Sequence, residues 1–248
     1  MGFDQIIIMN HTLFISDLHL QPERPDITEN FRSFLKTQAI QADALYILGD
    51  LFEAWVGSDD CAEFNQSICQ AILNLTQAGI PVYFMRGNRD FLIAHDFIKA
   101  TGCRILPDPT KIDLYGISVL LTHGDMLCTQ DPKHQRFRKF SQNPKYNFLF
   151  LKLPLFLRRW IARSLRQASR KHTSQLRDDA MDVDNSAVEE LMRSHQVLQL
   201  IHGHTHRPAI HSLTIDHHAA QRIVLGDWEK QANALIYSAN GEFQLLKY

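Results

Sequence analysis

The sequence predicts an α/β protein built from two packed sheets, and three observations lead to this prediction. Five short apolar runs each end at a Gly or a polar residue, as buried strands do. Helical patterns at Thr28–Gln38, Ala62–Ala78 and Asp184–His195 alternate with these runs, as helices on the faces of a sheet do. After Arg222 three more strand-like runs follow without helices, which predicts a second sheet and hence a sandwich.

The predicted strands can be placed in chain order. Those of the first sheet are Leu13–Ile15, Leu45–Leu48, Val82–Met85, Val119–Thr122 and Val197–Ile201. Those of the second sheet are Ile223–Leu225, Ala234–Ser238 and Phe243–Leu246. A chain of 248 residues can bury a complete core, so we expect a single domain spanning residues 1–248.

Positive charge is concentrated in one segment. Between Lys133 and Arg177 there are 13 Lys and Arg residues and no Asp or Glu, which is half of the 26 basic residues in the chain. We expect residues 130–182 to form a helical cap, inserted after the strand that ends at His123, that meets an anionic partner. Nucleic acid has the required charge, but no recognised nucleic-acid-binding fold surrounds the segment, so we expect no nucleic-acid partner.

The cap also contains the most apolar stretch, Phe148–Leu157. It is about half of the ~20 residues needed to span a bilayer, and Lys152 and Pro154 interrupt it, which excludes a transmembrane helix. Interleaved basic and apolar side chains suit the face of an anionic membrane, so we expect peripheral attachment, although the stretch could also be the core of the cap. Four cysteines without C-x-x-C spacing and an N-terminus without a basic n-region predict a site that faces the cytoplasm.

A side chain able to bind metal follows each of the five first-sheet strands, where loops converge at the carboxyl ends. In chain order these side chains are Asp17, His19, Asp50, Asn88, His123, His204 and His206. Carboxylate, imidazole and amide groups without thiolate suit Mn, Fe or Zn. Seven ligands are too many for one tetrahedral site but can serve two cations that share a bridging carboxylate. Gly49, Gly87 and Gly203 each precede a ligand, where a tight turn lets the backbone approach a small ion.

The order of these motifs, D-x-H, G-D, G-N-x-[DE], H and G-H-x-H, resembles that of the calcineurin-like metallophosphoesterases, and it runs from Asp17 to His206. The resemblance implies a four-layer αββα sandwich and hydrolysis by a hydroxide that two divalent metals activate. It also implies how the ligands divide: Asp17, His19 and His206 at one metal, Asn88, His123 and His204 at the other, and Asp50 as the bridge.

Arg89 stands where many members of that family have a histidine, directly after the asparagine of the motif. Such a histidine can protonate a poor leaving group, whereas an arginine, whose pKa exceeds ~12, cannot. An arginine can instead hold a phosphate by a bidentate fork. The leaving group should then need no added proton, as for a phosphate monoester with a second pKa near ~6 released from a pyrophosphate. We expect catalytic roles for Asp50, Asn88, Arg89 and His123.

Longer phrases resemble one enzyme family of lipid A biosynthesis, the UDP-2,3-diacylglucosamine diphosphatases. They are ISDLHL, DALYILGDLFEAWVG, GNRDF, THGDMLCTQD, MDV and LIHGHTHRPA, with the turn at Leu225–Trp228. The resemblance implies hydrolysis of the pyrophosphate of UDP-2,3-diacylglucosamine to UMP and 2,3-diacylglucosamine 1-phosphate (lipid X), with attack at the uridine-side phosphorus. It further implies two divalent ions, usually Mn²⁺, and a peripheral location on the cytoplasmic face of the inner membrane of a Gram-negative bacterium. We expect a monomer.

The same resemblance implies which residues contact the substrate. They are Asn88, Arg89, Asp131, Ser169, Thr173 and His204. To these we add Arg166, one of the cations of the cap, and Leu176, which stands where the family often has a lysine. Either Lys171 or Arg177 could replace that lysine, and the choice stays open.

Other polar residues are interpreted as groups that support the ligands or that have no part in the site. Glu53, Asp90 and Asp125 are expected to orient ligands. His134 is interpreted as a surface residue or one with satisfied hydrogen bonds, and Asp216 to His218 as a polar turn. Two other functions stay open: a different metallophosphoesterase activity, on nucleic acid or a phosphoprotein, and a non-catalytic membrane-surface protein with structural metals.

Overall fold

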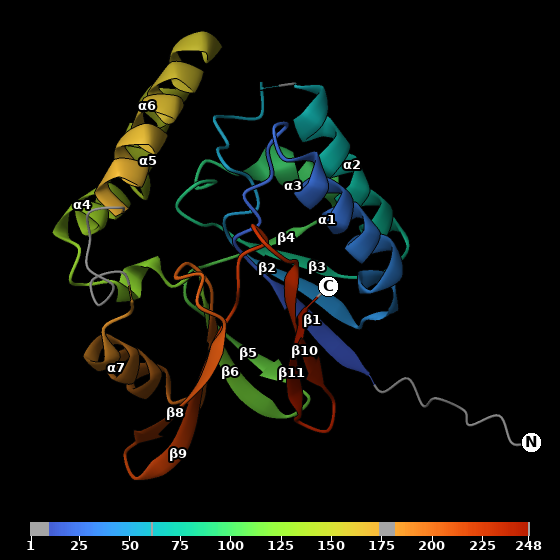
Figure 1. Cartoon of the computed structure of the whole chain (residues 1–248), viewed down its shortest axis with the longest axis vertical. Coiled ribbons are helices and arrows are strands. Elements are labelled where there is room, and N and C mark those ends of the chain that lie inside the picture. The colour runs from blue at the N-terminus through green and yellow to red at the C-terminus, as the bar shows by residue number, and fades with distance from the viewer. Residues whose placement is uncertain (1–9, 61, 174–181, 248) are drawn as a thin grey trace, which may run out of the picture.

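The computed structural model describes residues 10–60, 62–173 and 182–247 (Figure 1). Its α-helices are α1 (Pro25–Thr37), α2 (Glu63–Gln77), α3 (His95–Thr101), α4 (Pro132–Ser141), α5 (Pro144–Leu151), α6 (Leu155–Thr173) and α7 (Asn185–His195). Its strands are β1 (His11–Ile15), β2 (Ala44–Leu48), β3 (Val82–Met85), β4 (Arg104–Leu106), β5 (Thr110–Leu114), β6 (Ile117–Thr122), β7 (Gln199–His202), β8 (Ala209–Ile215), β9 (His218–Val224), β10 (Asn233–Ser238) and β11 (Phe243–Lys247). Two short 3₁₀ helices, at Ala39–Gln41 and Asp125–Leu127, complete these elements.

The first sheet has six strands in the order β11-β10-β1-β2-β3-β4. β1, β2, β3 and β4 pair in parallel, so their carboxyl ends lie at one edge of the sheet. β10 pairs antiparallel with β1, and β11 pairs antiparallel with β10. Every residue of β2 is buried, because helices cover one face of the sheet and the second sheet covers the other.

The second sheet has five strands in the order β5-β6-β7-β9-β8, with β6, β7 and β9 parallel to one another. The sequence-based grouping of strands is therefore wrong in detail. β6 and β7 were expected in the first sheet and lie in the second, whereas β10 and β11 extend the first sheet. Apolar runs look alike in either sheet, and the choice of sheet depends on pairing between strands that are far apart in the sequence.

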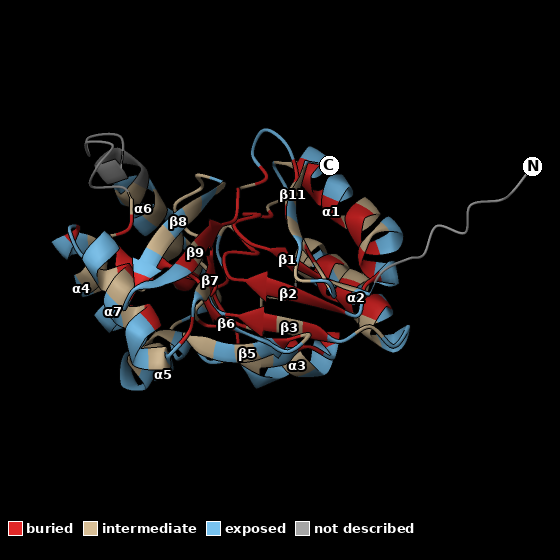
Figure 2. Ribbon diagram, turned by 90° about the horizontal axis from the view of Figure 1, so that it is seen from below, coloured by how far each residue is buried: buried red, intermediate tan, exposed pale blue. Residues whose placement is uncertain are grey.

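Three apolar cores separate four layers, as the αββα prediction requires. Phe34 of α1 and Ile72 of α2 pack in the core between the helices and the first sheet. Phe14 and Leu121 belong to the core between the two sheets. Val188 of α7 packs in the third core, against the outer face of the second sheet. Figure 2 shows the buried residues concentrated in the central strands, with α1 and α7 on opposite sides of the molecule.

Helices α4, α5 and α6, called the cap here, lie beside the sandwich and not within its layers (Figure 1). Local sequence explains where two of them begin. Asp131 caps α4 and Asn143 caps α5, and each is followed by a proline at the first helical position. The predicted helical character of the basic segment is confirmed over these residues. No helix within the described residues combines the length and the apolar character needed to cross a bilayer.

Candidate metal centre

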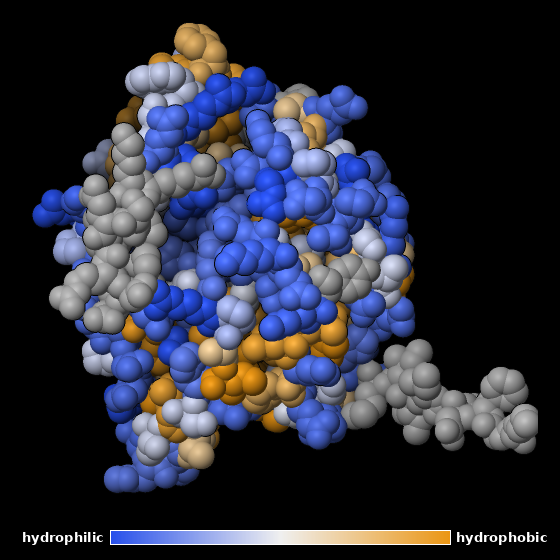
Figure 3. Space-filling model, in the orientation of Figure 1, coloured by the Kyte–Doolittle hydropathy of each residue, from blue (hydrophilic) through white to orange (hydrophobic). Residues whose placement is uncertain are grey.

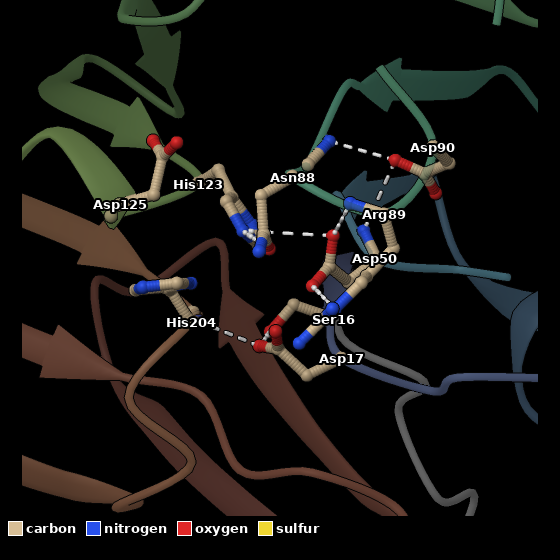
Figure 4. Close-up of polar contacts among 12 residues, drawn as sticks. Ser16, Asp17, Asp50, Asn88, Arg89, Asp90, His123, Asp125 and His204 are labelled. Atoms are coloured by element: carbon tan, nitrogen blue, oxygen red, sulfur yellow. Dashed lines mark hydrogen bonds and ion pairs between the residues drawn. The ribbon is translucent and has the colours of Figure 1, made fainter. Parts of the chain in front are cut away.

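Loops from both sheets bring the predicted ligands together (Figure 4). The first sheet supplies the loops after β1, β2 and β3, and the second sheet supplies the loops after β6 and β7. Six of the seven predicted ligands fall into two groups, and within each group the ligand atoms lie within 4.8 Å of one another. The groups are Asp17, His19 and His206, and Asp50, His123 and His204.

In the first group the side chains converge on one point. The Nε2 atoms of His19 and His206 lie 3.3 Å apart, and His206 Nε2 lies 3.4 Å from Asp17 Oδ1. Asp17 is fully buried, and its Oδ2 accepts hydrogen bonds from the Ser16 hydroxyl at 2.6 Å and the His204 backbone N–H at 2.8 Å. Its Oδ1 has no hydrogen bond within the described structure and faces the imidazoles, as a metal-binding oxygen would.

The second group includes Asn88 as well. His123 Nε2 lies 3.8 Å from Asp50 Oδ1 and 3.3 Å from Asn88 Oδ1. With its nitrogen turned inward, the Asn88 carboxamide donates to Asp50 Oδ2 at 2.7 Å, and with its oxygen inward it offers a further ligand atom. The rings of His123 and His204 have centroids 5.0 Å apart. The group thus combines a carboxylate, two imidazoles and a carboxamide.

The backbone is strained at five of the predicted ligands. Each has a φ angle in the left-handed region: Asp17 56°, His19 50°, Asp50 54°, His204 71° and His206 57°. A residue with a side chain pays of order 1–3 kcal/mol for this conformation, and such residues concentrate at functional sites. The strain marks these strand-end loops as the functional site.

Two glycines leave room for the carboxylates. A Cβ atom on Gly87 would collide with Asp50 Oδ1, and one on Gly203 would collide with Asp17 Oδ2. A side chain at either position would displace a predicted ligand. This agrees with the prediction that the glycines let the backbone approach closely at the site.

The surrounding carboxylates raise the pKa of two imidazoles. Burial lowers the pKa of His206, but Asp17 and Asp227 outweigh burial and raise this pKa to about 10. Burial likewise lowers the pKa of His123, and Asp50 and Asp17 raise it to about 9. Positive charge is thus favoured where the carboxylates converge. The carboxylate and imidazole donors, without thiolate, fit divalent cations such as Mn, Fe or Zn.

Further groups hold the ligands in place. His206 Nδ1 lies 3.0 Å from Asp227 Oδ2, and His123 Nδ1 donates to the Leu48 carbonyl at 2.8 Å. These contacts orient the ring nitrogen that faces the site, as outer partners of metal-binding histidines do. Asp227 was missed as such a partner; its only signal was its place in the Leu225–Trp228 turn.

Buried Asp90 organises the loops that carry two of the ligands. Its carboxylate accepts from the backbone N–H groups of Gly87 and Leu51, each at 2.8 Å, and so ties the loop after β3 to the loop after β2. Burial raises the pKa of Asp90 to about 7, with a further contribution from the neighbouring Asp50. These contacts agree with the expected orienting role of Asp90.

Arg89 joins the site to the cap. Its backbone N–H donates to Asp50 Oδ1 at 2.8 Å, and its side-chain Nε lies 3.9 Å from Asp50 Oδ2. Its Nη2 donates to the Ser169 hydroxyl of α6 at 3.5 Å. Two residues expected to contact substrate, one from the sandwich and one from the cap, therefore lie side by side.

Other predicted substrate contacts make contacts within the protein or lie at the end of the cap. Buried Asp131 accepts from the backbone N–H groups at the start of α4, and Thr173 is the last residue of α6. The Arg166 guanidinium pairs with Glu53. Leu176 and Arg177 lie outside the described residues.

The sequence interpretation of His134, as a surface or satisfied residue, did not place it beside a predicted ligand, where the structure has it. Its side chain is only 16% exposed, and its ring lies against that of His204, with centroids 4.9 Å apart. Its Nε2 lies 3.9 Å from Asp125 Oδ2, and burial lowers its pKa. The one available signal was its position three residues after Asp131, a predicted substrate contact at the start of a helix.

Comparison with known proteins agrees with this geometry. The family model of the calcineurin-like phosphoesterases matches residues 11–208. A protein of Pseudomonas aeruginosa named UDP-2,3-diacylglucosamine hydrolase is 52% identical over 94% of this chain and 97% of its own length. Proteins of the same name from Coxiella burnetii (51% identity, 96% and 97% coverage) and Stenotrophomonas maltophilia (49%, 93% and 96%) are similarly close. The chain therefore belongs to the calcineurin-like phosphoesterase family and, within it, to the group of the UDP-2,3-diacylglucosamine hydrolases.

Proposed function

We propose that this protein hydrolyses the pyrophosphate bond of UDP-2,3-diacylglucosamine, giving UMP and 2,3-diacylglucosamine 1-phosphate. The observation that carries the proposal is the pair of ligand groups, each within 4.8 Å, beside the Arg89 side chain. The relatives of the same name, about half identical over almost the whole chain, support the choice of substrate.

The ligand groups would hold two divalent cations, with Asp50 between them, and we propose Mn²⁺ as the usual ion. When bound, such cations polarise phosphate oxygens and make water a stronger nucleophile at neutral pH. The residues of the chain then orient the reacting groups. Asn88 and His123 lie together against Asp50, so a change in any one of them disturbs the others.

Arg89 is the proposed phosphate clamp. Its side chain is 19% exposed, so it is held at the rim of the site and can reach a bound anion. Its guanidinium can neutralise charge that develops on the diphosphate, but it cannot donate a proton. This fits a leaving group that departs as a phosphate monoester. Ser169, beside Arg89, would contact the same diphosphate from the cap.

The proposed substrate contacts on the remaining elements follow from the family pattern. They are Asp131, Thr173 and His204, in addition to Asn88, Arg89 and Ser169. Arg166 and Leu176 are proposed as well, because of their places in the cap sequence and not because of the family pattern. We also propose that residues 130–182 act as a cap inserted into one domain of 248 residues. The cap would cover the lipid part of the substrate while the sandwich holds the diphosphate.

The surface of the cap supports a location at a membrane. Of twelve exposed large hydrophobic residues in the described part of the chain, eight lie on α4, α5 and α6. They are Phe140, Tyr146, Phe148, Leu149, Leu151, Phe156, Trp160 and Leu165. Figure 3 shows hydrophobic residues at the tip of the cap, next to hydrophilic ones. We propose that this surface attaches the protein, as a monomer, to the cytoplasmic face of the inner membrane, where anionic lipids attract Lys and Arg.

Incubation of the purified protein with UDP-2,3-diacylglucosamine and Mn²⁺ tests the proposal, with UMP as the measured product. In H₂¹⁸O we expect the label in UMP, because attack is proposed at the uridine-side phosphorus. Absence of UMP with each of Mn²⁺, Mg²⁺, Co²⁺ and Zn²⁺ would overturn the assignment.

Two controls separate the proposal from its alternatives. Much faster turnover of single-stranded DNA or a phosphopeptide would favour another metallophosphoesterase activity. Asp50→Ala should abolish hydrolysis, because it removes the carboxylate proposed to bridge the two cations; unchanged hydrolysis would mean that the metals are structural.

A further inference from the structure

Helix α6 of the cap is fastened to one loop of the sandwich, residues 50–60, which begins with the predicted bridging ligand Asp50. Three arginines of α6 make the attachment. Arg158 and Arg159 pair with Asp59 and Asp60 at the far end of the loop. Two turns further along α6, Arg166 pairs with Glu53, close to the site. The helix is thus held at two separate points on the same loop.

The contact at Glu53 is well defined. Both carboxylate oxygens are used: Arg166 Nε donates to Oε1, and Arg166 Nη2 donates to Oε2 at 2.9 Å. The two side chains are 11% and 20% exposed, so the pair is largely shielded from water. A two-point pairing of this kind fixes the relative orientation of the two groups as well as their distance.

Glu53 also faces a predicted metal ligand. Its Oε2 lies 3.5 Å from His19 Nδ1, while His19 Nε2 points to the centre of the first ligand group, 3.3 Å from His206 Nε2. The same oxygen, Oε2, therefore lies between Arg166 and His19. A carboxylate on the outer nitrogen of a metal-binding histidine fixes the orientation of the ring and raises its basicity as a ligand.

The backbone holds Glu53 and His19 in register. The Glu53 N–H donates to the Leu20 carbonyl at 3.1 Å, and the His19 N–H donates to the Asp50 carbonyl at 3.0 Å. Leu20 and Phe52 form a parallel bridge between the same two segments. Because the two backbone segments are fixed to each other, a shift of α6 that moves the Glu53 side chain would change its contact with the His19 imidazole.

We propose that Glu53 is a positioning residue that couples the seating of cap helix α6, through Arg166, to cation binding by His19 in the first ligand group. The proposal rests on the metal site of the proposed function but not on the identity of the substrate. Coupling between two sites is reciprocal. A bound cation should therefore hold α6 more firmly, and loss of the Arg166–Glu53 pair should weaken cation binding.

Asp60 provides a matched control. It pairs with Arg159 of the same helix, from the same loop, yet the described contacts do not link it to a metal ligand. Asp60→Asn removes a cap attachment and leaves the His19 contact in place. Any effect on cations that appears in Glu53 variants and not in Asp60→Asn therefore comes from the position of Glu53.

The test uses the full-length protein, stripped of metal with a chelator and titrated with Mn²⁺ by calorimetry. Glu53→Ala should weaken the affinity of one of the two cations by about 10–100-fold, as loss of an outer carboxylate does. Glu53→Gln keeps the shape of the side chain and should restore part of the loss. Arg166→Met should weaken the same cation by a smaller factor, and Asp60→Asn should leave both affinities within about twofold of the wild type.

Hydrogen exchange gives a second readout that needs no substrate. Mn²⁺ should slow amide exchange in α6 of the wild type and of Asp60→Asn, and should do so much less in Glu53→Ala. Equal cation affinities in Glu53→Ala and the wild type, no effect of Arg166→Met, or equal slowing of α6 in all variants would each overturn the coupling. Because neither readout involves hydrolysis, failure to cleave UDP-2,3-diacylglucosamine would count against the proposed function alone.

Discussion

The imidazole of His134 lies against that of His204, with ring centroids 4.9 Å apart and planes tilted by 35°. His134 lies on α4, in the cap, and His204 is a predicted metal ligand in the loop after β7. The cap therefore contacts one ligand of the second group directly, His204 through His134, and is linked to one ligand of the first group, His19, by the Arg166–Glu53 pair.

His134→Ala should destabilise the protein, because it removes a ring contact at the base of the cap. Aromatic pairs contribute about 0.5–1.5 kcal/mol beyond the area that they bury, so we expect the free energy of unfolding to fall by about 1 kcal/mol or more. His134→Phe keeps the ring and should stay closer to the wild type. Urea unfolding of the metal-free proteins measures the difference; equal losses in the two variants would show that the ring contact is not the cause.

Arg89→Ala should reduce turnover while leaving the metal content unchanged. The contact of Arg89 with Asp50 that orders the loop comes from the backbone N–H, which the substitution keeps. Loss of a charged group that stabilises the transition state costs roughly 100–1,000-fold in rate. Steady-state kinetics and metal analysis of the same preparation give both quantities, with Arg89→Lys as the partial substitute. Metal loss in Arg89→Ala would assign the side chain a structural role.

Cation binding should release protons at neutral pH. In the metal-free protein the pKa of His206 is about 10 and that of His123 is about 9, so both imidazoles carry a proton at pH 7. A metal-bound imidazole must lose it, and binding should release about two protons. Since fewer protons have to be displaced as pH rises toward these pKa values, cation affinity should increase with pH. Calorimetry in buffers of different ionisation enthalpy checks this, and a heat independent of the buffer would contradict it.

Substitution of exposed apolar residues of the cap should weaken binding to anionic vesicles. Phe156 is 74% exposed and Trp160 is 63% exposed, so replacing both with Ser removes apolar surface without opening the core. Burial of each large side chain contributes about 1.5–3 kcal/mol, and we expect at least a tenfold loss of binding. Cosedimentation with vesicles of phosphatidylglycerol and phosphatidylethanolamine measures it. Ile210→Ser on β8, at a position 44% exposed, is the control; equal binding by all three proteins would rule out attachment through the cap.

The parts of the site that could be predicted are those that depend on short stretches of sequence. Each predicted ligand lies within a few residues of the end of an apolar run, and the carboxyl ends of parallel strands lie together, so a local pattern was enough to predict that these side chains meet. Asp17 and His19 illustrate this, because both lie within four residues of the end of β1. The helices α1, α2 and α7 were also predicted to within a few residues, since their apolar spacing is local.

The parts that could not be predicted depend on contacts between distant segments. β10 joins β1 across more than two hundred residues, and nothing in its apolar pattern distinguishes that partner from one in the second sheet. Arg166 and Glu53 are 113 residues apart, and one arginine among the 13 basic residues of the cap cannot be matched to a carboxylate without coordinates. For the same reason the contact between His134 and His204 could not be predicted.

Each ligand group takes residues from both sheets: Asp17 and His19 with His206, and Asp50 with His123 and His204. A cation bound in either group would therefore act as a cross-link between the two halves of the sandwich, much as a disulfide would in an oxidising compartment. Bound metals would then be part of the fold as well as of the chemistry, and a chelator would loosen the sheets first at the edge that carries the two ligand groups.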